Sequence, residues 1–313
     1  MDLCLMIEGQ EGVSWEQWRA LASACEQHAI PTLFRSDHYM NLDGQHPERE
    51  SLDAWGTLSA LAAVTSSLRL GTLVSPATFR HPSNLAKLVA SADQISGGRV
   101  ELGLGAGWHE REHEAYGFEF RATRARMDVL AEQLQILLGS WTEAPFSFAG
   151  QHYRLDNLEA KPTPIQKPHP PLIMGGAAGP RSVSLAARFA GEYNTAFPTL
   201  DDISARRQRI AKACERAGRD PIPFSVMTGF VVGSDRSSYE DRVGRVTERT
   251  GGDAGAFLAD PPGAWITGTI DEAVEQLQAL KNAGVSRVMC QNLLHDDLDV
   301  VALIGSQLAP QLA

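Results

Sequence analysis

Long apolar runs are absent from this chain of 313 residues. No stretch approaches the roughly 18–20 consecutive apolar residues that a membrane-spanning helix requires. The first residues lead directly into a strand-like segment, without the basic region, apolar core and small-residue cleavage site of a secretory signal. We therefore expect a cytoplasmic protein that has no signal peptide and does not associate with membranes.

Cysteine and basic residues are also scarce. The four cysteines, Cys4, Cys25, Cys214 and Cys290, form no Cys-x-x-Cys pair, and we expect small buried apolar residues in a reducing compartment. Lys and Arg number 28 against 38 Asp and Glu, so the formal charge is −10. This excess of acid argues against non-specific binding to nucleic acid or anionic membranes, which depends on clustered basic residues. A small molecule is the expected partner.

What the chain does contain is a short apolar run, a turn and an amphipathic helix, repeated eight times. The apolar runs lie at residues 3–7, 32–35, 69–74, 100–104, 172–174, 192–196, 224–232 and 285–290. Two capping boxes, at Ser14 with Gln17 and at Thr269 with Glu272, predict helix starts. Strands that alternate with helices predict a parallel sheet, and eight units favour closure into a (β/α)8 TIM barrel. We expect one domain over residues 1–313.

Two segments depart from this pattern. Residues from about 143 to 171 are rich in proline and carry Phe146, Phe148 and Tyr153 around Gly150. They predict a hairpin and an extended excursion, an insertion between strands four and five. Residues 236–262 are polar and contain Gly251, Gly252 and Gly255, so we interpret them as a long loop after strand seven.

In a TIM barrel the active site lies in the loops that follow the strands. Glycine-rich turns follow strands four and five, around Gly105 and Gly107 and around Gly175, Gly176 and Ala177. Glycine permits close approach of backbone to a ligand, so amides can converge on an anion at a helix N-terminus. The spacing matches neither a dinucleotide-binding fingerprint nor a Walker loop. Each turn alone also fits tight strand-to-helix geometry, but two together favour a phosphate-bearing cofactor, to which Arg181 would add charge.

Asp37 and His38 follow strand two and form the sharpest polar pair. A histidine near neutral pH acts as a general acid or base, and a neighbouring carboxylate orients it. The alternative is a loop histidine bonded to local backbone. His109, Glu110 and His113 spell the His-Glu-x-x-His zinc motif, but a zinc site needs a third ligand, so a zinc hydrolase is a distant alternative. The absence of a Gly-x-Ser-x-Gly elbow leaves serine hydrolysis unsupported.

Taken together, several stretches resemble the luciferase-like family of flavin and deazaflavin oxidoreductases. They are Ser-Asp-His at 36–38, Arg-Leu-Gly-Thr-Leu-Val at 69–74, Phe-Arg-His-Pro at 79–82, residues 93–108 with Gly-Leu-Gly-Ala-Gly-Trp, Glu-His at 112–113, and the proline-rich approach to Gly175 and Gly176. The resemblance implies a (β/α)8 barrel with an insertion, usually a homodimer. Asp-His after strand two and Gly-Ala-Gly-Trp after strand four are similar to the branch that uses coenzyme F420, with FMN as the alternative cofactor.

The resemblance also implies residue roles. Cofactor contacts are expected from Leu73, Val74, Ser75, Gly105, Gly107, Trp108, Gly175, Gly176, Ala177 and Arg181. Leu73 and Val74 match the place of a cis non-proline peptide behind the cofactor ring, and Asp37 and His38 match residues beside it. Candidates on the substrate side are Glu8, Trp108, His109 and Asn194.

We therefore hypothesise a hydride-transfer enzyme in which a deazaflavin ring lies at the barrel mouth. Hydride passes to or from ring carbon C5, and His38, oriented by Asp37, supplies or removes the balancing proton. An FMN-dependent monooxygenase in the same barrel and a barrel that binds a ligand without chemistry stay open as alternatives. The loops after strands seven and eight show no basic pair of the kind that sugar-phosphate dehydrogenases of this family use, which makes a phosphorylated sugar a doubtful substrate.

Overall fold

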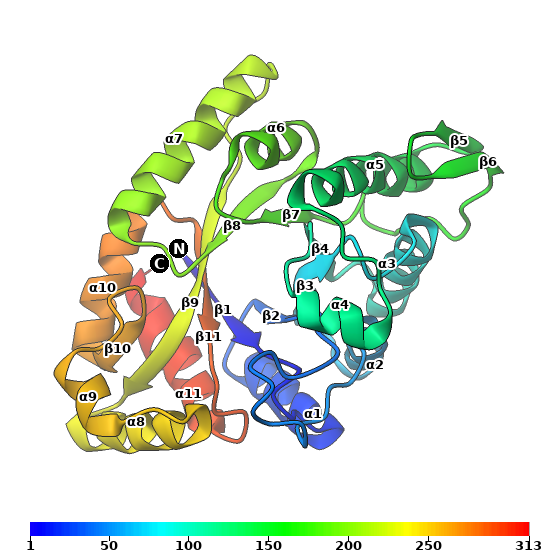
Figure 1. Ribbon diagram of the computed structural model, residues 1–313. Coiled ribbons are helices and arrows are strands. Elements are labelled where there is room, and N and C mark those ends of the chain that lie inside the picture. Colours follow the sequence, from blue (N-terminus) through cyan, green and yellow to red (C-terminus); the bar gives the residue numbers. More distant parts are fainter. Residues whose placement is uncertain (313) are drawn as a thin grey trace.

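The computed structural model describes residues 1–312, in which eight parallel strands surround a common axis (Figure 1). The strands are β1 (Asp2–Ile7), β2 (Thr32–Arg35), β3 (Arg69–Pro76), β4 (Val100–Gly105), β7 (Leu172–Gly175), β8 (Glu192–Ala196), β9 (Phe224–Gly233) and β11 (Arg287–Gln291). Each pairs with the next in this order, and β11 pairs in parallel with β1, which closes the barrel. The predicted TIM barrel is confirmed.

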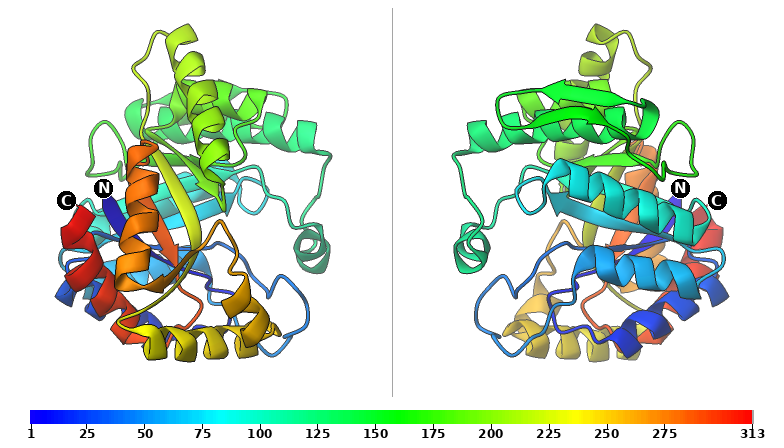
Figure 2. Two further views of the ribbon diagram at one scale, coloured as in Figure 1. Left: turned by 90° about the vertical axis from the view of Figure 1, so that its left-hand side faces the viewer. Right: turned by 90° about the vertical axis from the view of Figure 1, so that its right-hand side faces the viewer.

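Helices cover the outside of the barrel (Figures 1 and 2). They are α1 (Trp15–Gln27), α2 (Ala54–Val64), α3 (Pro82–Ser96), α4 (Glu110–Tyr116), α5 (Thr123–Thr142), α6 (Pro180–Phe189), α7 (Leu200–Arg216), α8 (Arg236–Thr250), α9 (Ala254–Ala259), α10 (Ile270–Asn282) and α11 (Leu298–Leu303), which continues as a π turn (Ile304–Leu308) and a 3-10 turn (Ala309–Leu312). Both predicted capping boxes form. None of these helices is both long and apolar enough to cross a membrane.

The predicted insertion contains a hairpin of β5 (Phe146–Ala149) and β6 (Arg154–Leu158), which lies at the end of α5 away from the barrel (Figure 1). Glu132 on α5 accepts hydrogen bonds from the amides of Gln151, His152 and Tyr153. These bonds hold the hairpin turn against α5.

The prediction of a long loop over residues 236–262 is wrong. The segment forms α8 and α9, followed by a short strand β10 (Ile266–Thr269) that pairs in parallel with β9. Asp235 caps α8, and Tyr239, Val243 and Val246 bury one stripe of it. That stripe is narrow, and the polar residues around it concealed the helical period. Gly251, at φ 71°, ends α8 rather than opening a loop.

Strand residues alternate between two apolar layers. Leu3, Leu5 and Ile7 of β1 face the helices, while Cys4 and Met6 belong to a small cluster inside the barrel. All four cysteines are buried and unpaired by disulfides, as expected, and burial raises the pKa of Cys4 to about 12. Buried polar side chains lie at both ends of the barrel strands, including Glu101 near the start of β4 and Gln291 at the end of β11.

Candidate active site

A cavity of ≈ 1070 Å³ opens at the carboxyl ends of the strands, where the barrel fold predicts the site. This exceeds the roughly 300–1,000 Å³ of typical ligand pockets. The predicted site residues that line it are Glu8, His38, Leu73, Val74, Gly105, Gly107, Trp108, Gly175, Gly176, Ala177 and Asn194. Asp37, Ser75, His109 and Arg181 are not among the residues that line the cavity.

Val74 forms part of the cavity floor over three glycines. A Cβ added to Gly103, Gly105 or Gly175 would lie 2.9, 2.8 or 3.1 Å from a Val74 methyl carbon. The Leu73–Val74 peptide is cis, and the β3–β4 register shifts between Thr72 and Ser75. Because the three glycines have no side chains, the Val74 side chain fits between them. The surface that Leu73 and Val74 form here, which we call the bed, is apolar.

The two glycine-rich turns lie in the cavity wall, as predicted. Gly107 has φ +77°, and a Cβ there would lie 2.6 Å from Thr78 Oγ1. Gly176 has φ +151°, and its amide donates to the Asn194 carbonyl over 3.1 Å. Gly179 caps α6 without a side-chain hydrogen bond, and Ser182 in its first turn lines the cavity. This end of the cavity therefore presents a helix N-terminus that favours anions.

His38 and Glu112 form a buried pair in the cavity wall. His38 Nδ1 lies 2.7 Å from Glu112 Oε2, and the Tyr39 amide donates to Glu112 Oε1 over 2.5 Å. Burial lowers the pKa of His38, but the hydrogen bond and the charge of Glu112 outweigh it and raise that pKa above its usual value. Burial raises the pKa of Glu112, and His38 overcomes this so that the carboxyl stays ionised. The pair favours an imidazolium next to a carboxylate.

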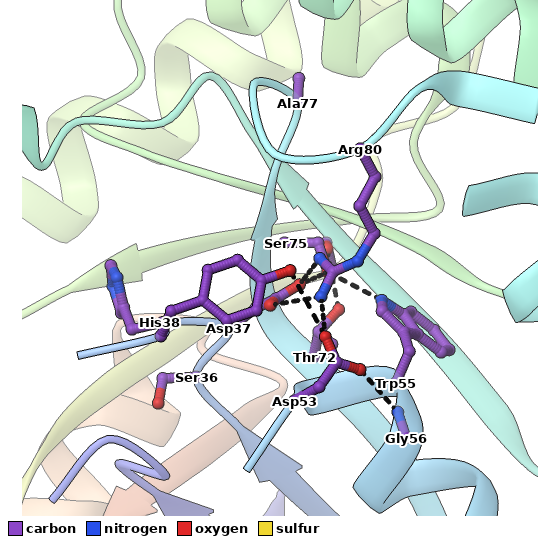
Figure 3. A network of polar contacts seen from close by, with 12 residues as sticks. Ser36, Asp37, His38, Asp53, Trp55, Gly56, Thr72, Ser75, Ala77 and Arg80 are labelled. Carbon is purple, nitrogen blue, oxygen red and sulfur yellow. Dashed lines mark hydrogen bonds and ion pairs between the residues drawn. The ribbon is translucent and has the colours of Figure 1, made fainter. Parts of the chain in front are cut away.

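Asp37 is not the partner of His38. Its carboxylate accepts from Arg80 Nη1 and Nη2 over 2.6 and 3.0 Å and from Ser75 Oγ over 2.5 Å. Figure 3 shows these contacts, with Arg80 also paired to Asp53 at 2.6 Å, while His38 points away from them. Adjacent side chains at the end of a strand leave the backbone on opposite sides, so Asp37 and Ser75 lie behind the cavity wall. The predicted catalytic and cofactor roles of these two residues are not supported.

The zinc alternative fails on the geometry of its two histidines. His113 Nδ1 bonds to the His109 carbonyl and Nε2 to Thr78 Oγ1, both over 2.7 Å, so no ring nitrogen is left for a metal. His109 Nε2 lies 3.1 Å from the Leu42 carbonyl instead. In the described part of the chain no three His, Cys, Asp or Glu side chains are grouped to hold a metal ion.

The sequence profile of the luciferase-like monooxygenase family matches residues 4–287. The chain belongs to this family. It is 32% identical over 234 residues to an F420-dependent hydroxymycolic acid dehydrogenase of Mycobacterium tuberculosis, a match that covers 72% of this chain and 63% of that protein. It is 28% identical to an FMNH2-dependent dimethylsulfone monooxygenase of Pseudomonas putida, over 87% of this chain and 77% of that one. The crystal structure of the monooxygenase RslO1 from Streptomyces bottropensis superimposes over both full chains with a TM-score of 0.85 at 22% identity.

This member of the luciferase-like family holds cationic side chains in the cavity that sequence reasoning missed. Arg181, which the sequence predicted at the phosphate end, does not line the cavity and contacts the Arg124 carbonyl and Asp128 on α5. Arg126 and Arg206 line the cavity in its place. Arg126 Nε donates to the Gly107 carbonyl over 3.2 Å, and Arg206 pairs with Asp202 at 3.0 Å. The sequence offered one signal for the position of Arg126 in the cavity, namely a basic residue beside the apolar stripe of α5.

The substrate-side candidates lie in two settings. The carboxylate of Glu8 accepts from Gln291 Nε2 over 2.6 Å and from Gln10 Nε2 over 2.9 Å. Asn194 Nδ2 donates to Ser225 Oγ over 2.9 Å. Trp108 is 62% exposed at the mouth, with its ring centroid 5.9 Å from that of His38. Trp108 thus lies beside His38, and the charge of Glu8 acts on His38. The His109 ring centroid lies 6.3 Å from that of His38, but its Nε2 faces the Leu42 carbonyl.

Proposed function

We propose that this chain is an oxidoreductase that binds coenzyme F420 in the cavity and transfers hydride between it and a small organic substrate. The hydroxymycolic acid dehydrogenase of Mycobacterium tuberculosis, which this chain resembles, is described as F420-dependent. The cavity has the volume for a tricyclic ring and a second small molecule. Its apolar floor and its anion-favouring end match the two chemical halves of a phosphorylated deazaflavin.

The residues present fit such a cofactor. Leu73 and Val74 would lie against the ring, because their bed is apolar and the three glycines beneath Val74 leave it room. Gly107 and the first turn of α6 would hold the phosphorylated arm by backbone amides, and Gly176, which has no side chain, would let the backbone approach it closely. Arg126 and Arg206 would add positive charge to that end.

His38 is the residue that we assign to proton transfer. When bound, the deazaflavin supplies a ring carbon that accepts or donates hydride. Glu112 occupies Nδ1 of His38, which leaves Nε2 as the nitrogen that exchanges a proton with substrate. General acid–base help of this kind raises a rate by roughly 10²–10⁴-fold. The single observation that carries the proposal is this charge-paired histidine in the wall of a glycine-bedded apolar cavity.

Titration with each cofactor tests the proposal. Visible absorbance of F420 and of FMN is followed as purified protein is added, and we expect F420 to bind. Gly175→Ala places a Cβ 3.1 Å from Val74 and should weaken binding, whereas Gly191→Ala, whose Cβ would meet nothing closer than the Leu172 carbonyl at 3.8 Å, should not. A sample that takes up neither pigment contradicts the proposal.

An FMN-dependent monooxygenase is the second candidate. The observation that favours it is the similarity to the FMNH2-dependent enzyme over 87% of this chain. Tight FMN binding together with substrate-dependent oxygen consumption would establish it in place of F420 chemistry. Cofactor binding with no turnover of any substrate would leave a binding protein. That the active form is a homodimer stays a prediction, which light scattering can test.

A further inference from the structure

Two arginines from distant parts of the chain meet in the cavity wall. Arg49 lies in the loop between β2 and α2, and Arg249 lies in the last turn of α8. Arg49 Nη2 donates to the Arg249 carbonyl over 2.8 Å. Both side chains also contact Glu11: Arg49 donates to the Glu11 carboxylate, and Arg249 donates to the Glu11 backbone carbonyl. The pair is therefore fixed in position by the turn after β1.

The Arg49–Arg249 pair has N–H donors without partners and an excess of positive charge. Arg249 uses only Nη2, on the Glu11 carbonyl and on His295 Nδ1 at 3.4 Å, and its Nε and Nη1 have no partner within residues 1–312. The Glu11 carboxylate pairs with Arg49, and within residues 1–312 no carboxylate forms an ion pair with Arg249, so the two guanidinium groups keep a net positive charge. An arginine with free donors at the edge of a cavity is suited to bind an oxyanion.

The lowered pKa of His295 is consistent with an excess of positive charge around the arginine pair. Its side chain is buried, and its Nε2 has no hydrogen-bond partner in the described chain. Burial together with the charges of Arg249 and Arg49 lowers the pKa of His295 to about 3. The ring is therefore neutral at physiological pH. It accepts from Arg249 without adding to the charge.

The arginine pair is separate from the end that we assign to the phosphorylated arm. Arg49 lies in the loop before α2 and Arg249 lies on α8, whereas Gly176 precedes α6 and Ser182 lies in its first turn. Figure 1 shows α8 and α6 on opposite sides of the barrel. Once a cofactor occupies the glycine turns, the Arg49–Arg249 pair remains for the substrate.

We propose that the substrate carries an anionic group, a carboxylate or a phosphate, which Arg249 and Arg49 bind. The inference rests on the proposed function, since it names the class of substrate for the same cavity. Glu8 and the exposed Asp43 also line the cavity and repel an anion. Glu8 contributes to the field at His38. The substrate therefore orients with its charged group at Arg249 and its uncharged reacting carbon towards Glu8 and His38.

Isothermal titration of the cofactor-saturated protein at constant ionic strength tests this. The probes are propionate, its neutral isostere propionamide, and inorganic phosphate. We expect propionate or phosphate to bind and propionamide not to bind. The tighter of the two anions identifies the group as a carboxylate or a phosphate.

Variants locate the site. Arg249→Gln should raise the Kd of the anion about tenfold or more. Arg236→Gln, on the same helix but in an exposed pair with Glu272, should change it by less than about twofold. Arg249→Lys keeps the charge and should recover part of the affinity, and thermal unfolding of each variant checks that it is folded.

Equal binding of propionamide and propionate, or equal losses in Arg249→Gln and Arg236→Gln, would overturn the proposal. So would loss of binding in Arg126→Gln but not in Arg249→Gln, because the anion would then occupy the glycine-turn end. The cofactor titration is a separate measurement. If neither F420 nor FMN binds, the proposed function fails, and the comparison of Arg249→Gln with the parent protein in the absence of cofactor still decides the anion site.

Discussion

The two ends of this barrel treat buried charge in opposite ways. At the amino ends of the strands, Arg287 Nη2 lies 2.6 Å from Glu101 Oε2 and 2.9 Å from Glu192 Oε2, and Arg69 Nε lies 2.7 Å from Glu101 Oε1. Two arginines and two carboxylates pair with one another there, although burial and the charge of Glu101 hold the pKa of Glu192 above its usual value. At the carboxyl ends, His38 Nε2 and two donors of Arg249 have no partner among residues 1–312. The amino end is thus closed by a plug of ion pairs formed by Arg69, Glu101, Glu192 and Arg287, whereas the carboxyl end has unpaired donors in the wall of a cavity.

The difference separates stability from function in one fold. Burial raises the pKa of Glu101, but the charges and hydrogen bonds of Arg287 and Arg69 lower it below its usual value. Buried ions of this kind are tolerated because each has partners, and removing one partner leaves an uncompensated charge. At the open end the unused donors line the cavity, where a ligand can pair with them. Four experiments test this contrast.

The largest effect is expected at the open end. His38→Ala removes the group that exchanges the proton, so turnover with a competent substrate should fall roughly 10²–10⁴-fold. The Kd of the cofactor should barely change, because the floor and glycine turns are untouched. Steady-state kinetics and the absorbance titration measure the two quantities. Unchanged turnover would refute the proton role.

The closed end should respond in stability. Arg287→Met leaves Glu101 and Glu192 buried without their shared cation, and should lower the free energy of unfolding by about 3–5 kcal/mol. Urea denaturation followed by circular dichroism measures it. The matched control is Arg236→Gln, which breaks an exposed pair and should cost less than about 1 kcal/mol. Similar midpoints for the two variants would show that the plug does not stabilise the fold.

A smaller effect distinguishes the two carboxylates near His38. Glu112→Gln removes its hydrogen-bonded partner, so the pKa of His38 should fall. Asp37→Asn should move that pKa less, because Asp37 bonds to Arg80 and Ser75 instead. NMR titration of the His38 ring protons compares the variants. A larger shift in Asp37→Asn would restore Asp37 as the partner.

The smallest effect concerns pH and stability. The pKa of His38 is raised, so its contribution is complete below its ordinary value of 6.5 and is lost as the pH rises through the raised value. The pKa of Glu112 is lowered, so its contribution is complete above 4.5 and is lost as the pH falls through the lowered value. The stability difference between the parent protein and Glu112→Gln should therefore be greatest between pH 4.5 and 6.5 and decline on both sides. A difference that stays the same below pH 4.5 and above pH 6.5 would contradict the ion pair.

Most of the fold could be predicted because its signals are local. Apolar runs, capping boxes and glycine turns located the barrel strands, the hairpin and the two turns that line the cavity. The same method failed at α8, where a narrow buried stripe on a polar helix was interpreted as a loop. Among the predicted site residues near strand ends, His38, Val74 and Gly175 line the cavity, whereas Asp37 and Ser75 do not, and the roles of all of them stay predictions. Arg126, Arg206 and Arg249 were missed because they approach the cavity from helices.

The alternation of strands and helices, and therefore closure into a barrel with its site at one end, was determined by the sequence alone, since hydrophobic period and turn chemistry act between near neighbours. Which charges pair was decided only by the tertiary structure. His38 meets Glu112 across 74 residues, Asp37 meets Arg80 across 43, and Arg49 meets Arg249 across 200. Barrel closure brings these loops together, and pairing energy depends on distances that no spacing along the chain encodes.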